Sequence, residues 1–426
     1  MKKTTPKKVI KPIHVNQQLE IGSFPHTTEK GRIKATIPNL NHVFEQYSIL
    51  CQYDEILKKQ TIKFINSDSE HEDNDLSENS TYAQIQSILA LNDMPSRTCE
   101  LIPKLLENNR VNPILKFITS KPWDGIDRLE ELINSLVVSE SVNTRYRFIA
   151  VRTWLIQCVA AADSARQSPL KHATPKFELV LVLQGPQGAF KTTWFKSLLP
   201  AELKDYILDG MHLDPVDRDV IKRCISCWIC ELGEIDATFR KADIARLKAF
   251  LSNERDNIRL PYGRADSNFR RKTSFGASVN PSVFLIDETG SRRFLTLPVI
   301  QCLPNELDMQ QVWAQVWELY LSGHQWWCSG ELNTLLAIQQ REHSEESPIG
   351  EAIASVFNIN EPARRTDVNY EFKHLTVSKI LNECGIHQLT KKDLSEARAY
   401  LDRQGFKQIA IDVRGYWITK DGKKDD

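Results

Sequence analysis

The clearest change in the pattern of apolar positions lies between residues 177 and 191. The run FELVLVLQ, residues 177–184, is continuously apolar over the length of a strand and ends abruptly in GPQG. Such a run is typical of a parallel strand that is buried on both faces. A helical pattern resumes at about Lys191. The sequence therefore predicts a strand, a glycine-containing loop and a helix, in that order.

Two further apolar runs of strand length follow, over residues 224–231 and 273–280. The first delivers Glu231 at its carboxyl end, with Glu234 three residues later, and the second ends in Asn280. The carboxyl ends of parallel strands meet at one edge of an open sheet, where ligands bind. We therefore expect these polar side chains to lie beside the glycine loop.

The pattern outside these strands is mainly helical and predicts several units. The segment NSDSEHEDNDLSENS has the composition of a solvated linker, and a metal site made from its acids is the less favoured interpretation because no apolar frame would hold them. The predicted units are a basic arm and small N-terminal module (1–65), an acidic linker (66–80), a helical collar (81–172), an α/β core (173–335), a linker (336–375) and a C-terminal domain (376–420).

The C-terminal domain reads as helix, helix and hairpin. The first helix covers 377–384, the second begins at a capping-box-like Thr390 and Asp393 and runs to 404, and a hairpin joins 407–413 to 416–419. This order is the plan of a winged helix. Such domains bind duplex DNA or dock proteins, and the candidate phosphate contacts here are Lys391, Lys392, Arg398 and Arg403.

Composition narrows the class of protein. Lys and Arg total 55 against 55 Asp and Glu, and apolar residues make up 41% of the chain, which excludes a polybasic binder and a disordered chain. No run approaches the roughly 18 apolar residues of a membrane helix. Nine cysteines, an odd number, favour reduced thiols. We expect a cytoplasmic protein without a membrane partner.

Three of these cysteines, Cys224, Cys227 and Cys230, share a spacing that superficially suits an iron–sulfur cluster. On a strand, however, Cys227 would face away from the other two. We therefore interpret them as small apolar core residues.

The glycine loop fits the phosphate-binding pattern G-x-x-x-x-G-K-[ST] except that Phe190 replaces the last glycine. Backbone N–H groups of such a loop converge on phosphates, the lysine adds a positive charge and the hydroxyl ligates Mg²⁺. Because of Phe190, the alternative interpretation is a degenerate loop that no longer binds nucleotide. The candidate nucleotide-binding residues are Gly185, Gln187, Gly188, Ala189, Phe190, Lys191, Thr192 and Thr193, with Thr192 and Glu231 as candidate Mg²⁺ ligands.

The polar residues that follow the other strands suit phosphoryl transfer. One of Glu231 and Glu234 would hold Mg²⁺ through water and the other would orient the attacking water, while Asn280 would bridge that water and the γ-phosphate. Arg292 and Arg293 follow on a turn, from which an arginine reaches a phosphate in a neighbouring subunit. The alternative for Asn280 is a turn residue without a role in the reaction. The alternative for the two arginines is a solvated surface.

A basic stretch with interleaved aromatic residues lies between the acids and Asn280. Cations and aromatic rings on one loop suit a phosphate backbone with stacked bases, and the alternative is a solvated turn. The candidate nucleic-acid residues are Arg259, Tyr262, Arg264, Arg270, Arg271 and Lys272, with Phe269 among them.

Five motifs, GPQGAFKTT, WICELGEID, LKAFLSNERDNIRLPYGR, FGASVN and DETGSRRF, follow one another in an order that resembles the virulence-associated protein E family. Those proteins are related to superfamily 3 helicases and to the helicase half of poxvirus-type primase–helicases. The resemblance covers residues 112–298 and begins with KPWDGIDRL. It implies an AAA+-like P-loop ATPase that assembles into rings, commonly hexamers, in replication of prophages and other mobile elements.

By motif, the resemblance gives each candidate a role. Lys191 and Thr192 hold the β/γ-phosphates and Mg²⁺, Glu231 and Glu234 form the acidic pair, Asn280 is the sensor, and Arg292 or Arg293 is the trans-acting finger. The basic stretch corresponds to the DNA-facing hairpin. The departure at Phe190 affects the expected catalytic rate more than the fold.

We therefore expect an α/β, superfamily 3-type ATPase with a helical collar and a winged helix, which uses ATP and Mg²⁺ to translocate on DNA or unwind it. Single-stranded DNA would lie in the ring channel, and duplex DNA would contact the winged helix. The first 110 residues show no primase site, so a separate primase or host replication proteins would be partners. The alternative is a non-hydrolysing DNA-binding initiator or scaffold. A nucleotide-triggered defence ATPase is a weaker option.

Overall fold

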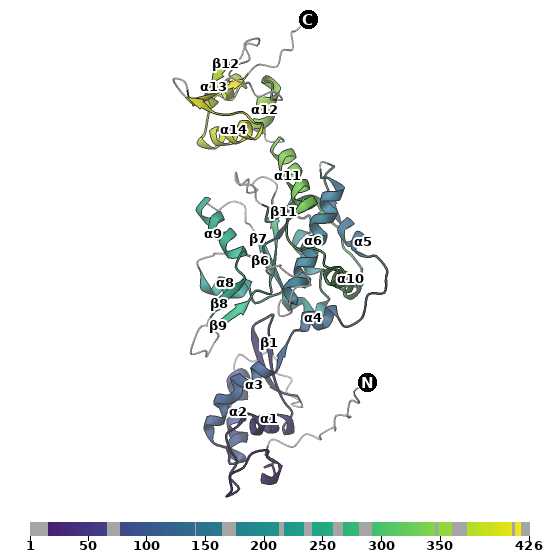
Figure 1. Cartoon of the computed structure of the whole chain (residues 1–426), viewed down its shortest axis with the longest axis vertical. Helices are drawn as coiled ribbons and strands as arrows, with labels where there is room; N and C mark the ends of the chain where they lie inside the picture. Colours follow the sequence, from purple (N-terminus) through teal and green to yellow (C-terminus); the bar gives the residue numbers. More distant parts are fainter. Residues whose placement is uncertain are drawn as a thin grey trace.

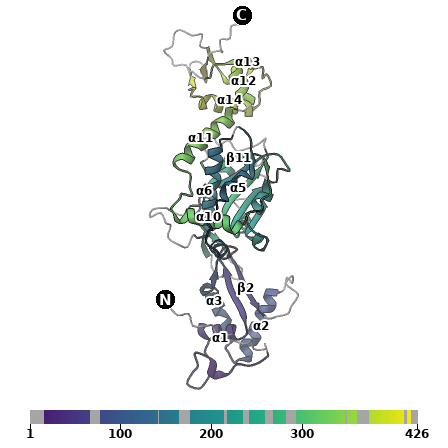
Figure 2. The ribbon, with the colours of Figure 1, turned by 90° about the vertical axis from the view of Figure 1, so that its right-hand side faces the viewer.

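The chain forms three parts that follow one another along the long axis of the molecule (Figure 1 and Figure 2). The computed structural model describes residues 16–65, 77–140, 142–163, 176–212, 217–233, 241–258, 267–280, 292–345, 348–359, 373–410 and 414–418. The N-terminal part lies at one end, a central part built on a large sheet lies in the middle, and the C-terminal part lies at the other end. Within these residues, no helix combines the length and apolar character needed to cross a membrane.

The central part is built on a six-stranded mixed sheet with strand order β4-β11-β5-β10-β7-β6. Strand β4 pairs antiparallel with β11, and the other strands run parallel. Strands β5, β7 and β10 are buried along most of their length, as a sheet covered on both faces requires. The expected α/β class is thus confirmed. The strands are β4 (Leu136–Val138), β5 (Val180–Gln184), β6 (Ile207–Met211), β7 (Ile229–Gly233), β10 (Ser274–Val279) and β11 (Phe294–Cys302).

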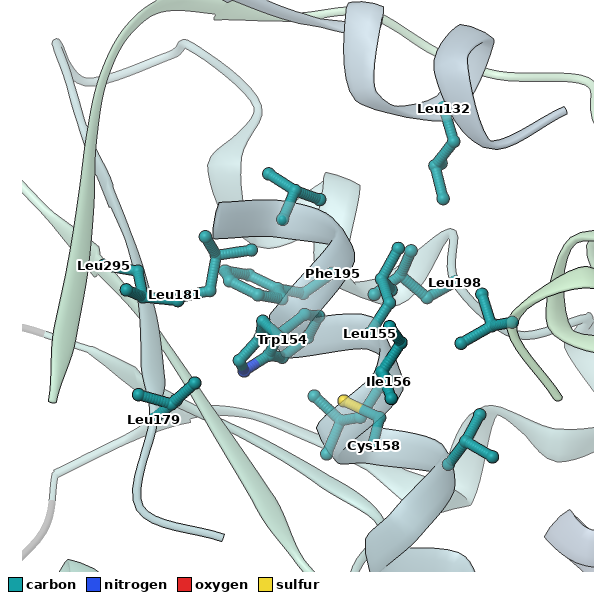
Figure 3. Packing of buried hydrophobic residues seen from close by; sticks show 14 of the residues in the cluster. Leu132, Trp154, Leu155, Ile156, Cys158, Leu179, Leu181, Phe195, Leu198 and Leu295 are labelled. Atoms are coloured by element: carbon teal, nitrogen blue, oxygen red, sulfur yellow. The ribbon is translucent and has the colours of Figure 1, made fainter. Parts of the chain in front are cut away.

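Helix α6 (Thr144–Ala162) lies at the centre of the main hydrophobic core, and helix α10 (Met309–Leu321) packs on it. The side-chain amide of Gln157 on α6 exchanges two hydrogen bonds, each 2.9 Å, with the backbone of Leu179 just before β5. Figure 3 shows apolar side chains of α6 packed against those beside β5 and on the helix that follows it. Helix α6 is therefore part of the layer that supports the glycine loop.

This placement differs from the predicted collar over 81–172. Helix α6 is buried nearly all round because one side faces the sheet and another faces α10, so its residues share one core with β5. Trp313 on α10 is buried in the same core, and its indole N–H donates to the backbone oxygen of Leu198 (2.7 Å). The other helices of the central part are α4 (Pro113–Ile118), α5 (Leu129–Asn134), α7 (Lys191–Lys196), η3 (Ala201–Tyr206), α8 (Arg218–Cys224), α9 (Lys241–Leu251) and α11 (Gly330–Glu345).

The N-terminal part extends further along the chain than the predicted module. Its hydrophobic core combines residues on both sides of the predicted linker, from Leu19 to Leu106. Residues 77–111 belong here, and not to a collar, because α2 and α3 bury Ile85, Ile88 and Leu105 in this core. Its elements are η1 (Ile21–Ser23), α1 (Ile37–Gln46), β1 (Ile49–Asp54), β2 (Lys59–Phe64), α2 (Ser77–Leu91), η2 (Ser96–Leu101), α3 (Ile102–Asn108) and β3 (Arg110–Val111).

The turn between β1 and β2 joins the N-terminal part to the central part through buried polar groups. Lys58 donates to the backbone oxygen of Ile225, and Tyr206 donates to the carboxylate of Asp54. Glu55 forms an ion pair with Lys272, with 3.2 Å between Oε1 and Nζ. Burial lowers the pKa of Lys58 to about 8. Sequence patterns did not reveal this junction.

The C-terminal part contains the predicted order of helix, helix and hairpin. The capping box at the start of α14 is confirmed: Asp393 N–H donates to Thr390 Oγ1 (3.2 Å), and Thr390 N–H donates to Asp393 Oδ2 (2.8 Å). Part of the predicted linker 336–375 is structured, since α11 extends into it and α12 buries Ile353 in the C-terminal core. The elements are α12 (Pro348–Val356), β12 (Lys373–Leu375), α13 (Val377–Glu383), α14 (Lys391–Arg403), β13 (Ile409–Ala410) and β14 (Arg414–Ile418), with sheet order β12-β14-β13.

Candidate functional site

The glycine loop joins β5 to α7 at the carboxyl edge of the central sheet. Gly185 follows β5, and its N–H donates to the backbone oxygen of Val279 on the neighbouring strand (3.1 Å). A Cβ at Gly185 would lie 2.2 Å from the backbone oxygen of Val299, so only glycine fits there. Gly188 turns the chain with φ of 85°. The predicted sequence of strand, loop and helix is confirmed over this segment.

Phe190 lies in a backbone conformation that favours glycine. Its φ is 58°, in the left-handed region, immediately before α7 begins at Lys191. A left-handed conformation costs a residue with a side chain about 1–2 kcal/mol. The ring is 56% exposed. The loop thus has a residue with a side chain in the left-handed region and displays its aromatic ring at the surface.

The ammonium group of Lys191 lies inside the loop. Its Nζ donates to the backbone oxygens of Gly185 (2.7 Å) and Pro186 (2.8 Å). Burial lowers the pKa of Lys191, although the negative charge of Glu231 acts in the opposite direction. The loop thus holds a lysine cation where its backbone turns. The remaining candidates, Ala189 buried and Gln187 and Thr193 exposed, also lie on this loop and the first turn of α7.

A carboxylate and a hydroxyl meet beside this lysine. Glu231, which is 1% exposed, lies in the middle of β7 and not at its carboxyl end as predicted, because the strand continues to Gly233. Its Oε1 is 3.2 Å from Thr192 Oγ1 on α7. Its Oε2 accepts a hydrogen bond from the N–H of Gly210 (2.6 Å). Oxygen ligands of this kind suit Mg²⁺, so Thr192 and Glu231 could hold that ion.

The N–H of Gly210 was missed at the sequence level. It comes from an irregular position in β6, where the pairing with β7 shifts between Leu208 and Met211 and φ of Gly210 is 62°. The pair Asp209-Gly210 is a turn signal that could have marked this irregularity. The hydrogen bond fixes which way the Glu231 carboxylate faces.

Asn280 lies at the same edge of the sheet. It follows β10, which lies between β5 and β7 in the sheet, and the register pairs Val279 with Gln184 and Ser278 with Gly233. Asn280 is exposed there, between the strand that leads into the loop and the strand that carries Glu231. Glu234 lies outside the described residues.

The two candidate arginines lie at the opposite edge. They precede β11, and the backbone oxygen of Arg293 accepts from the N–H of Val180 at the start of β5 (2.8 Å). The length of β5 therefore separates them from the loop, roughly 16 Å at the rise of a strand. Arg293 Nε donates to Glu178 Oε2 (2.9 Å) and to Ser252 Oγ (3.1 Å). Arg292 is exposed.

The predicted nucleic-acid residues do not share one environment in the structure. Strands β8 (Arg255–Ile258) and β9 (Ser267–Arg270) form an antiparallel ribbon, and Arg270 is exposed at its end. The predicted contacts Arg259, Tyr262 and Arg264 lie outside the described residues.

Arg271 and Lys272 require a correction. Both Arg271 Nε and Nη2 donate to the carboxylate of Asp256, and Nη1 donates to the backbone oxygen of Phe250 (2.6 Å). The Arg271 side chain is fully buried, and its guanidinium lies over the ring of Phe250. Lys272 is buried at the junction with Glu55, and burial lowers its pKa. Side chains held in this way are not displayed to DNA, so their role is structural.

This correction predicts a large loss of stability for Asp256→Ala. Removing the carboxylate leaves a buried guanidinium without its partner, which typically costs about 3–5 kcal/mol. Arg255→Ala, on the exposed side of the same ribbon, should change the free energy of unfolding by less than about 0.5 kcal/mol. Urea unfolding followed by tryptophan fluorescence measures both. Equal stability of the two variants would contradict the structural role.

The three spaced cysteines lie in the core, as predicted, but not on one strand. Cys224 ends α8, and β7 begins only at Ile229. Cys224, Cys227 and Cys230 are buried in one hydrophobic cluster, and burial raises the pKa of Cys230. Since Cys224 belongs to a helix, the alternation expected of a strand does not hold here. Among the described residues, no group of three or more His, Cys, Asp and Glu side chains could hold a metal ion.

Together these observations define a mixed α/β protein with a glycine loop and a lysine at the carboxyl edge of its sheet and a buried acid, carried by β7, beside them. The profile of the virulence-associated protein E-like domain matches residues 118–345, more than half of the chain, and the chain belongs to this family. The resemblance drawn from the motifs is thereby confirmed.

Solved structures of the C-terminal region of NrS-1 are also similar. Two apo structures of that region are 12% and 13% identical to the chain, each with a TM-score of 0.43, over 89% of this chain and 98% of theirs. Among curated proteins, no match was found.

Proposed function

We propose that the protein is a ring-forming P-loop ATPase of the AAA+-like, superfamily 3 type, which couples ATP hydrolysis to translocation on DNA or its unwinding. Family membership supports a role in replication of a prophage or other mobile element. The observation that carries the proposal is the constellation at the loop. Lys191 lies on the loop backbone, and Thr192 lies 3.2 Å from the buried carboxylate of Glu231.

In this proposal, the loop N–H groups and Lys191 bind the β- and γ-phosphates. Thr192 and Glu231 supply oxygen atoms for Mg²⁺, which neutralises charge on the phosphates when it is bound. Glu231 is kept in position by the N–H of Gly210. Glu234 and Asn280 orient the attacking water at the γ-phosphate.

Ring formation would complete the site with an arginine from a neighbouring subunit. Within one chain, the arginines lie at the far edge of the sheet, which favours action on another subunit. Arg293 is held by Glu178 of its own chain, whereas Arg292 is exposed. We therefore assign the trans-acting role to Arg292. A hexamer is the expected assembly.

Two parts of the chain would contact DNA. The β8–β9 ribbon and the residues between its strands would face single-stranded DNA in the ring. The C-terminal part would act as a winged helix, with Lys391 and Arg398 exposed on α14 as candidate contacts to duplex phosphates. Its strand order, in which β14 lies between β12 and β13, supports that comparison.

The test compares ATP binding and phosphate release in two variants, Lys191→Ala and the control Lys196→Ala. Removing a charge-assisted contact to phosphate should weaken ATP binding roughly ten- to hundredfold. Lys196 lies on the same helix, but its exposed ammonium pairs with Asp209 (2.8 Å), so its removal should leave binding unchanged. Equal binding by both variants would contradict a nucleotide site at the loop.

The rival function is a non-hydrolysing DNA-binding initiator or scaffold. The observation that favours it is the strained, exposed Phe190 in the loop. This rival predicts DNA binding without phosphate release, with a loop that either no longer binds nucleotide or only senses it, so turnover separates the two functions.

A further inference from the structure

An apolar surface adjoins the glycine loop. Phe190, Ile300 and Leu303 are 56%, 57% and 42% exposed, which is high for large apolar side chains. Their two segments are joined directly, because the N–H of Cys302 donates to the backbone oxygen of Ala189 (2.9 Å). Exposed apolar side chains that gather beside a polar site mark a binding surface.

The order of the strands shows on which side of the loop this surface lies. In the sheet, β5 leads into the loop, with β10 and β7 on one side of it and β11 on the other. Asn280 and Glu231, which would act on the γ-phosphate, lie on the β10 and β7 side. Ile300 lies on β11, on the other side. A nucleoside triphosphate whose γ-phosphate faces Glu231 must direct its ribose and base away from Glu231, toward β11.

We propose that Phe190, Ile300 and Leu303 form the surface on which the nucleobase of the bound triphosphate packs. This inference rests on the proposed function and adds a site for the base to the phosphate contacts of the loop. It also gives the unusual loop residue a role. An aromatic side chain at the glycine position presents its ring at the loop's surface, beside the segment that carries Ile300, and aromatic rings stack on bases.

The surface also predicts a pattern of nucleotide preference. Apolar side chains contact the face of a base and do not read the hydrogen-bonding groups on its edge. The larger purines bury more area than pyrimidines on such a surface. ATP and GTP should therefore bind with similar affinity, and both should bind more tightly than CTP and UTP.

The experiment compares ATP with inorganic tripolyphosphate, which has no base, by titration calorimetry. The variants are Phe190→Asn, because asparagine tolerates the left-handed conformation, and Ile300→Asn on the separate segment. Ile338→Asn, at an exposed apolar position on α11, is the matched control. Phe190→Asn should weaken ATP binding roughly tenfold and leave tripolyphosphate binding unchanged. Ile300→Asn should act in the same direction, and Ile338→Asn should change neither.

Each other result overturns the inference. An equal loss for ATP and tripolyphosphate would mean that the variants disturb only the phosphate loop. Unchanged ATP binding in both variants would mean that the base lies elsewhere, while the proposed ATPase would stand. A change in oligomer mass with normal ATP preference would make the surface a subunit contact. If the wild-type chain binds neither ligand, the proposed function fails together with the inference.

Discussion

Glu231→Gln should retain ATP binding and lose about a hundredfold to ten-thousandfold in turnover. The buried carboxylate contacts Thr192 Oγ1 and accepts from the N–H of Gly210. Glutamine has the same shape, and its amide oxygen can still accept from Gly210, so the fold of the site should survive. It lacks the negative charge that would hold Mg²⁺ beside the phosphates. The chemical step should therefore fail while Lys191 and the loop still bind the nucleotide.

Steady-state phosphate release and ATP binding, measured on the same preparation, test this expectation. Glu202→Gln, an exposed carboxylate on η3, is the control and should match the wild type in both measurements. Full turnover in Glu231→Gln would remove Glu231 from the reaction. Loss of ATP binding together with turnover would show that the variant damages the loop.

Arg292→Ala should lose about a thousandfold or more in turnover, the usual size of a trans-acting arginine effect. The arginine lies about the length of a strand away from the loop of its own chain, so it would act on the phosphates of a neighbour. Arg293→Ala is the matched control on the same turn. Arg293 donates a hydrogen bond to Glu178, so its replacement should lower the free energy of unfolding and largely preserve turnover.

Mixing two inactive variants separates action within a chain from action between chains. Glu231→Gln subunits still offer Arg292, and Arg292→Ala subunits still have an intact acidic site. Mixed rings therefore contain interfaces with both groups, and turnover should return when the two variants are combined. Persistent inactivity in mixed assemblies of normal size would contradict the trans assignment.

The loop could be predicted because its signals are local. An apolar strand, two glycines and a lysine within fifteen residues specify the order of strand, turn and helix. The place of Asn280 followed from a general property of parallel sheets, since strand ends meet at one edge. The structure confirms that Asn280 lies between the strands that carry the loop and Glu231.

Other features depend on contacts between distant residues and could not be predicted in the same way. Arg271 sits in a basic stretch that looks solvated, but its partner Asp256 lies across the β8–β9 ribbon. Lys272 is buried where the turn of another hairpin brings Glu55 to it and where its ammonium group also donates to the backbone oxygen of Ala162. A charged side chain is identified as buried only when its partner is known.

The boundary between the N-terminal and central parts could not be predicted for the same reason. Helix α2 follows a polar segment that resembles a linker, yet its apolar residues pack back on elements that precede that segment. Helical periodicity shows that such a face exists. It does not show which other element covers that face.

The central claim is that the protein is a motor that couples ATP hydrolysis to translocation on DNA or its unwinding. The rate of phosphate release at increasing concentrations of single-stranded DNA tests this claim most directly. We expect the rate to rise with DNA and to saturate, and we expect Glu231→Gln to show no rise. DNA binding with no phosphate release at any DNA concentration would contradict the motor and support the initiator or scaffold.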